Sequence, residues 1–494
     1  MTVCLRSLLA AAALAAIAGC AVVPGDPPVP GDAPVPAEWQ APLPHGGQLG
    51  ALRVWWQQFD DPLLTELIDA AQTLSPTLAS AGSRLAQARA ARVAAGAALL
   101  PTLDATASAS RGRQDLGLGP GTSSSIGLQA AWEIDLFGAN QAARDAATLR
   151  LSGAQAGWHD ARIAVAADVA SSYAGLRACE AQLRQIRLDA DSRAETARLT
   201  ELAARAGFQP SASAALARAS AAQGRSLVTQ QRASCDLMVK SLVALTGIAE
   251  PALRAQLATR TAQQPQPAQL AVASVPAEAL AQRPDLYQAA AEVIAANADV
   301  DQAEALRYPR IGLAGNIGAA RFDAGPARLD GTVWSIGPVS VSLPIFDGGA
   351  RRANVDAARA RALEADALYR ARLRDAVREV ETALVSLQAS ADRQPDVVTA
   401  IEGFEQSLRA TEERYRGGLG SLFDLEDARR SAVQAQIALI DLQRERVAAW
   451  IALYRALGGG WTRADTPVAD ADPRADRFAT ADPRPSAAPA GAPH

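Results

Sequence analysis

The chain has 494 residues, enough for two to four ordinary domains, and its charge is nearly balanced, with 48 Lys and Arg residues against 52 Asp and Glu. No run of basic residues occurs and aromatic residues are few, so the composition argues against a nucleic-acid partner. Alanine is the dominant apolar residue, and small side chains let helices approach closely while each buries little area. The composition therefore predicts thin helical layers rather than one large globular core.

The sequence also lacks the motifs of common catalytic and metal sites. Lys240, the only lysine, is preceded by Asp236-Leu237-Met238-Val239, so no phosphate-binding P-loop is present. No Gly-x-Ser-x-Gly elbow occurs, and the three histidines, His45, His159 and His494, are scattered without metal-ligand spacing. We therefore predict a protein that is not an enzyme and that has no cofactor and no metal site.

The first residues resemble a bacterial lipoprotein signal. Arg6 supplies a positive charge, residues 7–16 are apolar, and Ile17-Ala18-Gly19-Cys20 resembles a lipobox. We predict that residues 1–19 are removed and that Cys20 is lipidated; an ordinary secretory signal with a chance cysteine is the alternative. No later run approaches the ~18 apolar residues of a transmembrane helix, so any spanning part is expected to be β.

A stretch rich in Pro, Gly and Ala follows, and we predict that residues 20–50 form a semi-extended tether. The next motif is Trp55-Trp56, which we interpret as a pair of packing anchors rather than a ligand site. A helical pattern begins at Leu63, with Pro62 suited to the first helical position and Asp61 as the expected cap.

The rest of the chain reads as one unit repeated twice: strand, loop, strand, a very long helix, a glycine turn and a shorter returning helix. A spacing that holds over several elements favours duplication. Three landmarks of the first copy recur 208, 209 and 211 residues later, in the pairs Pro101 and Pro309, Phe137 and Phe346, and Gly207 and Gly418. The predicted domains are a first repeat over residues 51–250, a linker or equatorial segment over 251–275, a second repeat over 276–461 and a disordered tail over 462–494.

Each repeat begins with two strands, over about residues 99–136 and 310–346. Apolar and polar residues alternate along them, as Leu103, Ala105 and Ala107 do with their neighbours. This period of two fits a transmembrane hairpin with one lipid face; a soluble four-stranded sheet packed on helices is the alternative. An open sheet edge is not tolerated in lipid, and closed membrane barrels begin near eight strands. We therefore predict that three copies pool twelve strands, with a dimer as the minimal alternative.

The helices that follow are unusually long. Residues 138–206 and 349–416 each fit one helix of about 100 Å, and the returning helices are about half that length. The predicted hairpins are 138–247 and 349–458. Shorter helices before the strands would stack end to end with the returning helices, so that each long helix gains a partner of similar length. We therefore predict a helical barrel that continues from the β-barrel and encloses a tunnel.

Two cysteines support the first hairpin. Cys179 lies 28 residues before the Gly207 turn and Cys235 lies 28 residues after it, so antiparallel arms put them at the same height. In an oxidising compartment they could form a disulfide. Two unlinked buried thiols are the alternative, and the spacing leaves both open.

Five motifs occur in a fixed order along the chain. They are Trp55-Trp56 with Phe59-Asp60-Asp61-Pro62, Arg283-Pro284-Asp285-Leu286, Tyr308-Pro309-Arg310-Ile311, Leu343-Pro344-Ile345-Phe346-Asp347-Gly348-Gly349 and Tyr415-Arg416-Gly417-Gly418. Together they resemble the TolC-like outer-membrane factor family, and most of all its NodT-type efflux lipoproteins. The resemblance implies a homotrimer, anchored in outer-membrane lipid, with a twelve-stranded barrel and a periplasmic helical barrel.

The same resemblance implies a function. Such channels are exit ducts of tripartite efflux systems, which passively conduct drugs or small metabolites from an inner-membrane pump and a periplasmic adaptor to the exterior. Type I protein secretion uses the same fold and is one alternative. A non-pore periplasmic coiled-coil lipoprotein scaffold is an alternative of a different class.

In that family, inward-bent helical turns close the periplasmic end, and acidic residues there ring the pore. In this sequence the gate residues would be Tyr415 and, after the motif that it begins, Asp424 and Asp427, which match the acidic residues of the family. The two aspartates stand three apart and share one helix face. Six carboxylates around a threefold axis would repel one another and attract cations. Alternatively, Ser421 and Asp424 form a capping box and the acids complement the helix dipole. The two interpretations are compatible.

The resemblance also implies that the turns at Gly207-Phe208 and Gly418-Leu419 are the tips that dock the adaptor. This sequence departs from the family pattern at two places. Gly420 stands where some relatives carry a latching arginine, and Ser213, close to Pro210, stands at the acid position of the first copy. We therefore expect a gate that is acidic on only one of its two hairpin sets.

Overall fold

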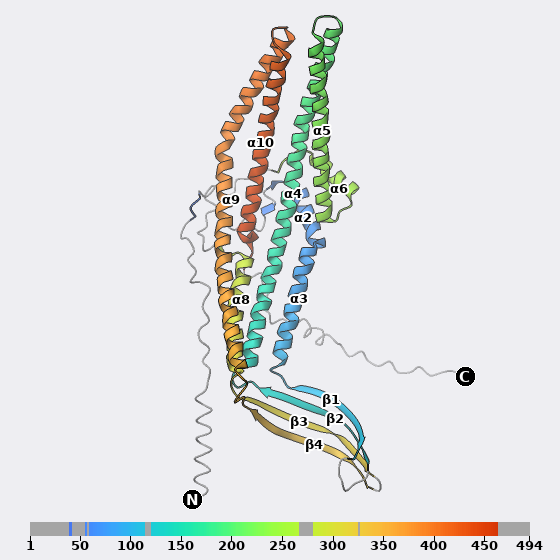
Figure 1. Ribbon diagram of the computed structural model, residues 1–494, viewed down its shortest axis with the longest axis vertical. Coiled ribbons are helices and arrows are strands. Elements are labelled where there is room, and N and C mark those ends of the chain that lie inside the picture. The colour runs from blue at the N-terminus through green and yellow to red at the C-terminus, as the bar shows by residue number, and fades with distance from the viewer. Residues whose placement is uncertain are drawn as a thin grey trace, which may run out of the picture.

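The computed structural model describes residues 39–41, 55–56, 59–113, 120–265, 280–324 and 327–462. The predicted signal peptide, Cys20, nearly all of the tether and the tail after Thr462 lie outside the described residues, as do residues 266–275 of the predicted linker. The described chain is elongated, with a four-stranded sheet at one end and two helical turns at the other (Figure 1).

Two helices run along most of the molecule: α4 (Ala139–Arg205) and α9 (Ala350–Arg416), with 67 residues each. At about 1.5 Å per residue each is about 100 Å long, as predicted. Each begins after a glycine with positive φ, Gly138 at 79° and Gly349 at 90°, where a side chain would be strained. The interior Pro395 of α9 was not anticipated; it removes one backbone hydrogen bond without ending the helix.

Shorter helices line up along the two long ones, which confirms the predicted stacking (Figure 1). Along α4 lie α5 (Ser211–Thr246) and α3 (Pro76–Ala97), joined through α2 (Pro62–Leu74). Along α9 lie α10 (Leu422–Ala456) and α8 (Pro284–Ala305). Because α8 and α10 also pack against α4, the two repeats form one continuous helical wall.

The joint between α10 and α8 explains the Arg283-Pro284-Asp285-Leu286 motif. The Arg283 side chain is buried and donates to the carbonyl of Ala456 at 2.9 Å and to the carboxylate of Glu379 at 2.8 Å. Gly458 has φ 73°, and a Cβ there would lie 2.2 Å from the carbonyl oxygen of Gln282. The end of α10 is therefore fitted closely onto the start of α8.

The main apolar core lies midway along the wall, where α2 packs against α4 and α5. Trp55 is fully buried there, between Trp450 and Tyr454, which supports its interpretation as a packing anchor. The prediction that Asp61 caps α2 is wrong: Asp61 occupies the cap position but makes no side-chain cap bond. Its carboxylate accepts a bond from the Tyr173 hydroxyl at 2.6 Å instead. Burial and this neighbouring carboxylate raise the pKa of Tyr173.

The sheet is antiparallel, in the order β1-β2-β3-β4. Its strands are β1 (Thr102–Gly112), β2 (Gly121–Ile134), β3 (Arg310–Ala324) and β4 (Ala327–Ser342). The predicted strand regions are confirmed, although β4 ends before the Leu343–Phe346 segment that the prediction included. β1 and β4 each leave one edge without a partner strand.

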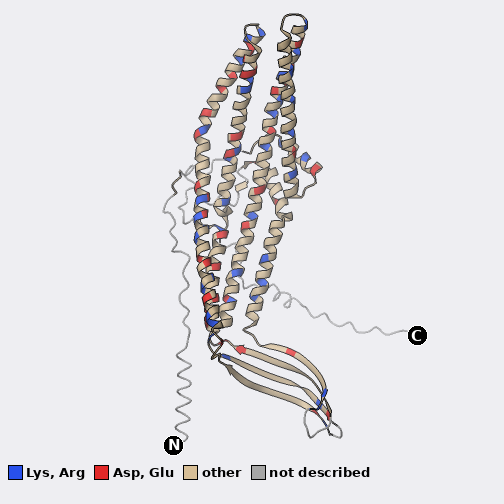
Figure 2. Cartoon of the chain, in the orientation of Figure 1, with Lys and Arg blue, Asp and Glu red and all other residues tan. Residues whose placement is uncertain are grey.

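The two faces of the sheet differ sharply in polarity. On one face apolar residues stand opposite one another across all four strands, as in Leu128↔Ile317 and Ile317↔Trp334. On the other face Ser108 stands opposite Ser125, and their hydroxyls are 2.9 Å apart. The charged residues of the strands lie mainly towards the strand ends (Figure 2).

No helix of the described residues covers the apolar face of this sheet. Trp334 is 69% exposed and Ile336 86% exposed. This differs from the alternative of a soluble sheet packed on helices, in which these side chains would be buried. None of the helices of the described chain is long and apolar enough to cross a bilayer.

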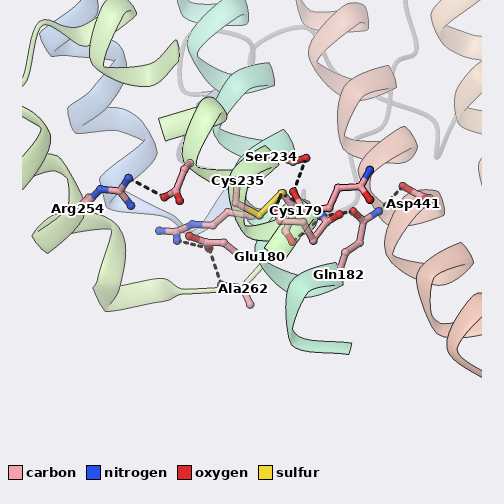
Figure 3. Close-up of a disulfide and its surroundings, with 12 residues drawn as sticks. Cys179, Glu180, Gln182, Ser234, Cys235, Arg254, Ala262 and Asp441 are labelled. Atoms are coloured by element: carbon pink, nitrogen blue, oxygen red, sulfur yellow. Dashed lines mark hydrogen bonds and ion pairs between the residues drawn. A yellow bond between two sulfur atoms is a disulfide. The ribbon is translucent and has the colours of Figure 1, made fainter. Parts of the chain in front are cut away.

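The first hairpin contains the disulfide that the cysteine spacing allowed. Cys179 of α4 and Cys235 of α5 are joined by an S–S bond of 2.12 Å, with 5.6 Å between their Cα atoms (Figure 3). One turn along α4, Gln182 donates to Asp441 of α10 at 3.0 Å. The covalent link therefore lies where the hairpin also meets the second repeat.

We expect non-reducing mass spectrometry of the mature protein to find Cys179 and Cys235 in one linked peptide pair. Because the bond closes a loop of 56 residues, the chain-entropy model gives at most about 4 kcal/mol of stabilisation. Cys179→Ser with Cys235→Ser should lower the unfolding temperature of the helical part within that limit. Free, alkylatable thiols at both positions in the native protein would contradict the bond.

Candidate functional site at the helical turns

The two turns at the far end of the wall have the same backbone geometry. Gly207 has φ 78° and Gly418 has φ 73°, a conformation that L side chains rarely adopt. After α4, the N–H of Phe208 donates to the carbonyl of Ala203 at 2.9 Å; after α9, the N–H of Leu419 makes the equivalent bond at 2.8 Å. Each long helix thus ends in the same glycine-based Schellman motif.

The residues after these glycines are unusual for such a motif. A hydrophobic residue at this position frequently packs back onto the last turn of its helix. Here Phe208 is 83% exposed and Leu419 is 80% exposed. Phe423, in the first turn of α10, is also largely exposed, and the sequence interpretation did not single it out. The turns therefore present three large apolar side chains that the described chain leaves uncovered.

Asp424 and Asp427 lie in the first turns of α10, and both are exposed. Ser421 and Asp424 form a complete capping box: the N–H of Asp424 donates to Ser421 Oγ at 3.1 Å, and the N–H of Ser421 donates to the Asp424 carboxylate at 3.3 Å. Asp427 pairs with Arg430 at 3.4 Å, on the surface. The capping interpretation of Asp424 is confirmed, and both carboxylates remain accessible to solvent.

Tyr415, the third predicted gate residue, connects the two hairpins. Its hydroxyl is 3.0 Å from that of Thr200 on α4. It also packs against a small apolar cluster that includes Ala217 of α5 and Leu425 of α10. Near the tips, the two hairpins therefore meet through this small apolar cluster and the pair of hydroxyls.

A buried ionic network behind the turns ties the hairpins more firmly. Glu426 of α10, whose side chain is 10% exposed, accepts bonds from Arg193 of α4 at 2.7 Å and from the hydroxyl of Ser220 of α5. Its other oxygen accepts from Arg429 at 3.2 Å. Arg193 also pairs with Asp189, 2.7 Å away and buried. Because these charges are mostly out of water, each depends strongly on its partners.

The sequence interpretation missed this network. Glu426 and Arg429 stand three apart between the apolar residues Leu425 and Ala432, a placement that points to charges on a buried helix face. Arg193, the partner of Glu426, lies 233 residues earlier, so only the fold brings the two together. Gly420 also has a packing role, because a Cβ there would lie 3.2 Å from the backbone nitrogen of Tyr415.

The surface charges of the turns form local ion pairs. Arg205 donates to Glu201 at 2.7 Å, one helical turn away, and this bond lowers the pKa of the Glu201 carboxyl. Within the described chain, no group of three His, Cys, Asp or Glu side chains is placed to hold a metal ion. The site therefore consists of exposed carboxylates and exposed apolar turns on two hairpins, which the Glu426 network joins.

A duplicated unit of two strands and two helices, with long helices that end in exposed turns, is the fold of solved outer-membrane channels. The chain belongs to the outer membrane efflux protein family, whose model matches residues 67–248 and 275–459. The two matched segments coincide with the two repeats, and the protein is accordingly an outer-membrane protein.

Individual relatives agree with this assignment. The chain is 33% identical over 433 residues to the pyoverdine export outer membrane protein OpmQ of Pseudomonas aeruginosa, a match that covers 83% of this chain and 88% of that protein. Nodulation protein T of Rhizobium leguminosarum bv. viciae is 28% identical over 438 residues, covering 85% and 89%. The structure of the outer-membrane channel OprN is similar with a TM-score of 0.76 at 27% identity, covering 86% of this chain and 99% of that one. The resemblance inferred from the motifs is confirmed.

Proposed function

We propose that three copies of this chain form the outer-membrane exit duct of a tripartite efflux system. The duct passively conducts drugs or small metabolites that an inner-membrane pump and a periplasmic adaptor deliver. Twelve pooled strands line the passage through the outer membrane, and the helical walls continue it through the periplasm.

The observation that carries this proposal is the exposed two-faced sheet. In the part of the chain that the structure describes, its apolar face has no covering helix, its other face is polar, and both of its edges are free. Lipid on the apolar face, water on the polar face and a closed ring of strands would satisfy all three features together. The relative OpmQ is a pyoverdine export outer membrane protein, which favours a small organic molecule as cargo.

The helical turns have two roles in this proposal. Phe208, Leu419 and Phe423 supply the apolar contacts for the adaptor, because they are large and uncovered. Asp424 and Asp427, gathered three times around the axis, line a narrow periplasmic entrance that favours cations. Tyr415 holds that entrance closed through Thr200.

The lipid anchor belongs to the same proposal. Cys20 lies outside the described residues, and the lipobox around it is the supporting observation. Acylation of Cys20 would fix the N-terminus to the outer membrane, with residues 21–50 as its tether. Mass spectrometry of the mature N-terminus decides this point, and an unmodified Cys20 would remove the anchor.

Planar bilayers test the channel itself. We expect the purified protein to give discrete conductance steps, small for the wild type and larger when Asp424 and Asp427 are both replaced by alanine. A heat-denatured sample is the control. Absence of steps from both forms, in a preparation that is folded by circular dichroism, would favour the non-pore scaffold over the duct.

A further inference from the structure

The helical wall has two free edges, as the sheet does. From one side to the other its order is α3 and α5, then α4, then α8 and α10, then α9 (Figure 1). The sheet begins with β1, which follows α3, and ends with β4, which precedes α9. A rotation that brings β1 against β4 of a second copy therefore brings the α3 and α5 edge against the α9 edge of that copy.

These two edges differ in charge. α3 contains three arginines and no acid, and α5 contains three arginines and one lysine against a single aspartate. On α5, Arg225 and Arg232 are exposed, and neither pairs with any residue of the described chain. Seven residues separate them, so they lie on the same side of the helix.

The α9 edge carries acidic residues in the stretch that lies at about the height of Arg225 and Arg232. Asp392, Asp396 and Glu402 are exposed, and no cation of the described chain pairs with them. Arg393, the only cation between residues 385 and 404 of α9, is engaged with Glu445 of α10 at 2.7 Å. This segment of α9 therefore keeps an unneutralised negative charge.

Hydrogen bonds across the wall show that the arginines of α5 and the acids of α9 lie at the same height along the molecule. Gln182 of α4 bonds to both Gln231 of α5 and Asp441 of α10. Along α10, Glu445 pairs with Arg393, and Gln436 bonds to Glu405. Asp441 lies between these two residues of α10, which puts it level with about residue 398 of α9. Gln231 and the adjacent Arg232 are therefore level with the stretch from Asp396 to Glu402.

We propose that an ionic seam joins neighbouring copies of this chain, with Arg225 and Arg232 of α5 facing Asp396 and Glu402 of α9 in the next copy. The proposal rests on the proposed trimer and assigns its contacts in the helical barrel. Rotation about a common axis keeps heights unchanged, so charges that are level within one copy are also level between neighbouring copies. The seam selects the partner edge, because the α3 and α5 edge would repel a second copy of itself.

Charge reversal tests the seam in the full-length protein in mild detergent at low salt. Arg225→Glu with Arg232→Glu should lower the ratio of trimer to monomer roughly tenfold or more, because like charges then face each other. Adding Asp396→Arg with Glu402→Arg to the same chain should restore the trimer. Raising the salt to about 1 M should shrink the difference between the reversed variant and the wild type. Analytical ultracentrifugation measures each ratio.

The matched control is Arg198→Glu with Arg205→Glu. Both arginines are exposed and seven residues apart, as Arg225 and Arg232 are, but they lie on α4, which has neighbours on both sides, and they pair only with acids of that helix. The control should leave the trimer intact. If the charge-reversed α5 variant is as trimeric as the wild type, the seam is wrong but the proposed channel is unaffected. The same conclusion follows if the α4 control loses as much trimer as the α5 variant does. A wild type that is monomeric would overturn both proposals.

Discussion

Replacing Asp424 and Asp427 together by alanine is expected to raise single-channel conductance several-fold and to let antibiotics leak into cells that express the variant. Both carboxylates are exposed on one side of α10, and three copies would crowd six of them around a narrow entrance. Removing the carboxylates also removes the cations that bind between them. An entrance that bound cations no longer occupy has a higher conductance. Planar-bilayer recording and inhibitory antibiotic concentrations measure the two effects.

The alanine variant also loses half of the capping box, because the Asp424 carboxylate accepts a bond from the N–H of Ser421, whereas the bond from the backbone N–H of residue 424 to Ser421 Oγ remains. One hydrogen bond of this kind contributes about 0.5–1.5 kcal/mol. Asp424→Asn with Asp427→Asn separates the effects, since an asparagine keeps a capping oxygen and loses only the charge. Glu413→Ala, at an exposed acid in the last turn of α9 paired with Arg416, is the matched control. Unchanged permeability in the asparagine variant would remove these residues from the gate.

Replacing Glu426 by alanine is expected to destabilise the helical part by about 3–5 kcal/mol, because it leaves buried cations without their carboxylate. The Arg193 and Arg429 side chains are 11% and 7% exposed and cannot recover water without moving the helices apart. Thermal unfolding followed by circular dichroism measures the loss.

Glu445→Ala is the matched control, since its pair with Arg393 is about half exposed and is worth less than about 1 kcal/mol. Combining Glu426→Ala with Arg429→Met should recover part of the loss, because Arg429 then keeps only the more distant carboxylate of Glu412, 3.7 Å away. A Glu426→Ala protein that unfolds at the same temperature as the control would show that the network contributes no more than a surface pair.

Much of this fold follows from local patterns. The glycines at 207 and 418 mark the ends of the long helices because only their positive φ allows the Schellman bonds that close them. The alternation of apolar and polar residues around Leu103 predicts that the sheet has one apolar and one polar face, whatever strands lie beside it. Constant offsets between the copies then predict that the second half repeats the first.

The parts that could not be predicted depend on contacts between distant segments. Asp61 has the right position for a cap, yet the Tyr173 hydroxyl, 112 residues later, takes its carboxylate. Glu426 looks like one more surface acid until Arg193 is placed beside it. Thr200 has no pattern of its own that would mark it as the partner of Tyr415.

The disulfide and Pro395 give the two hairpins opposite mechanical properties at the same distance from the turns. Cys235 lies four residues from Gln231, which is level with about residue 398 of α9, so the bond and the proline are nearly level. A covalent strut stiffens the first hairpin there, while the second has lost a backbone hydrogen bond in its long helix. A sideways load on both tips would therefore bend the second arm before the first.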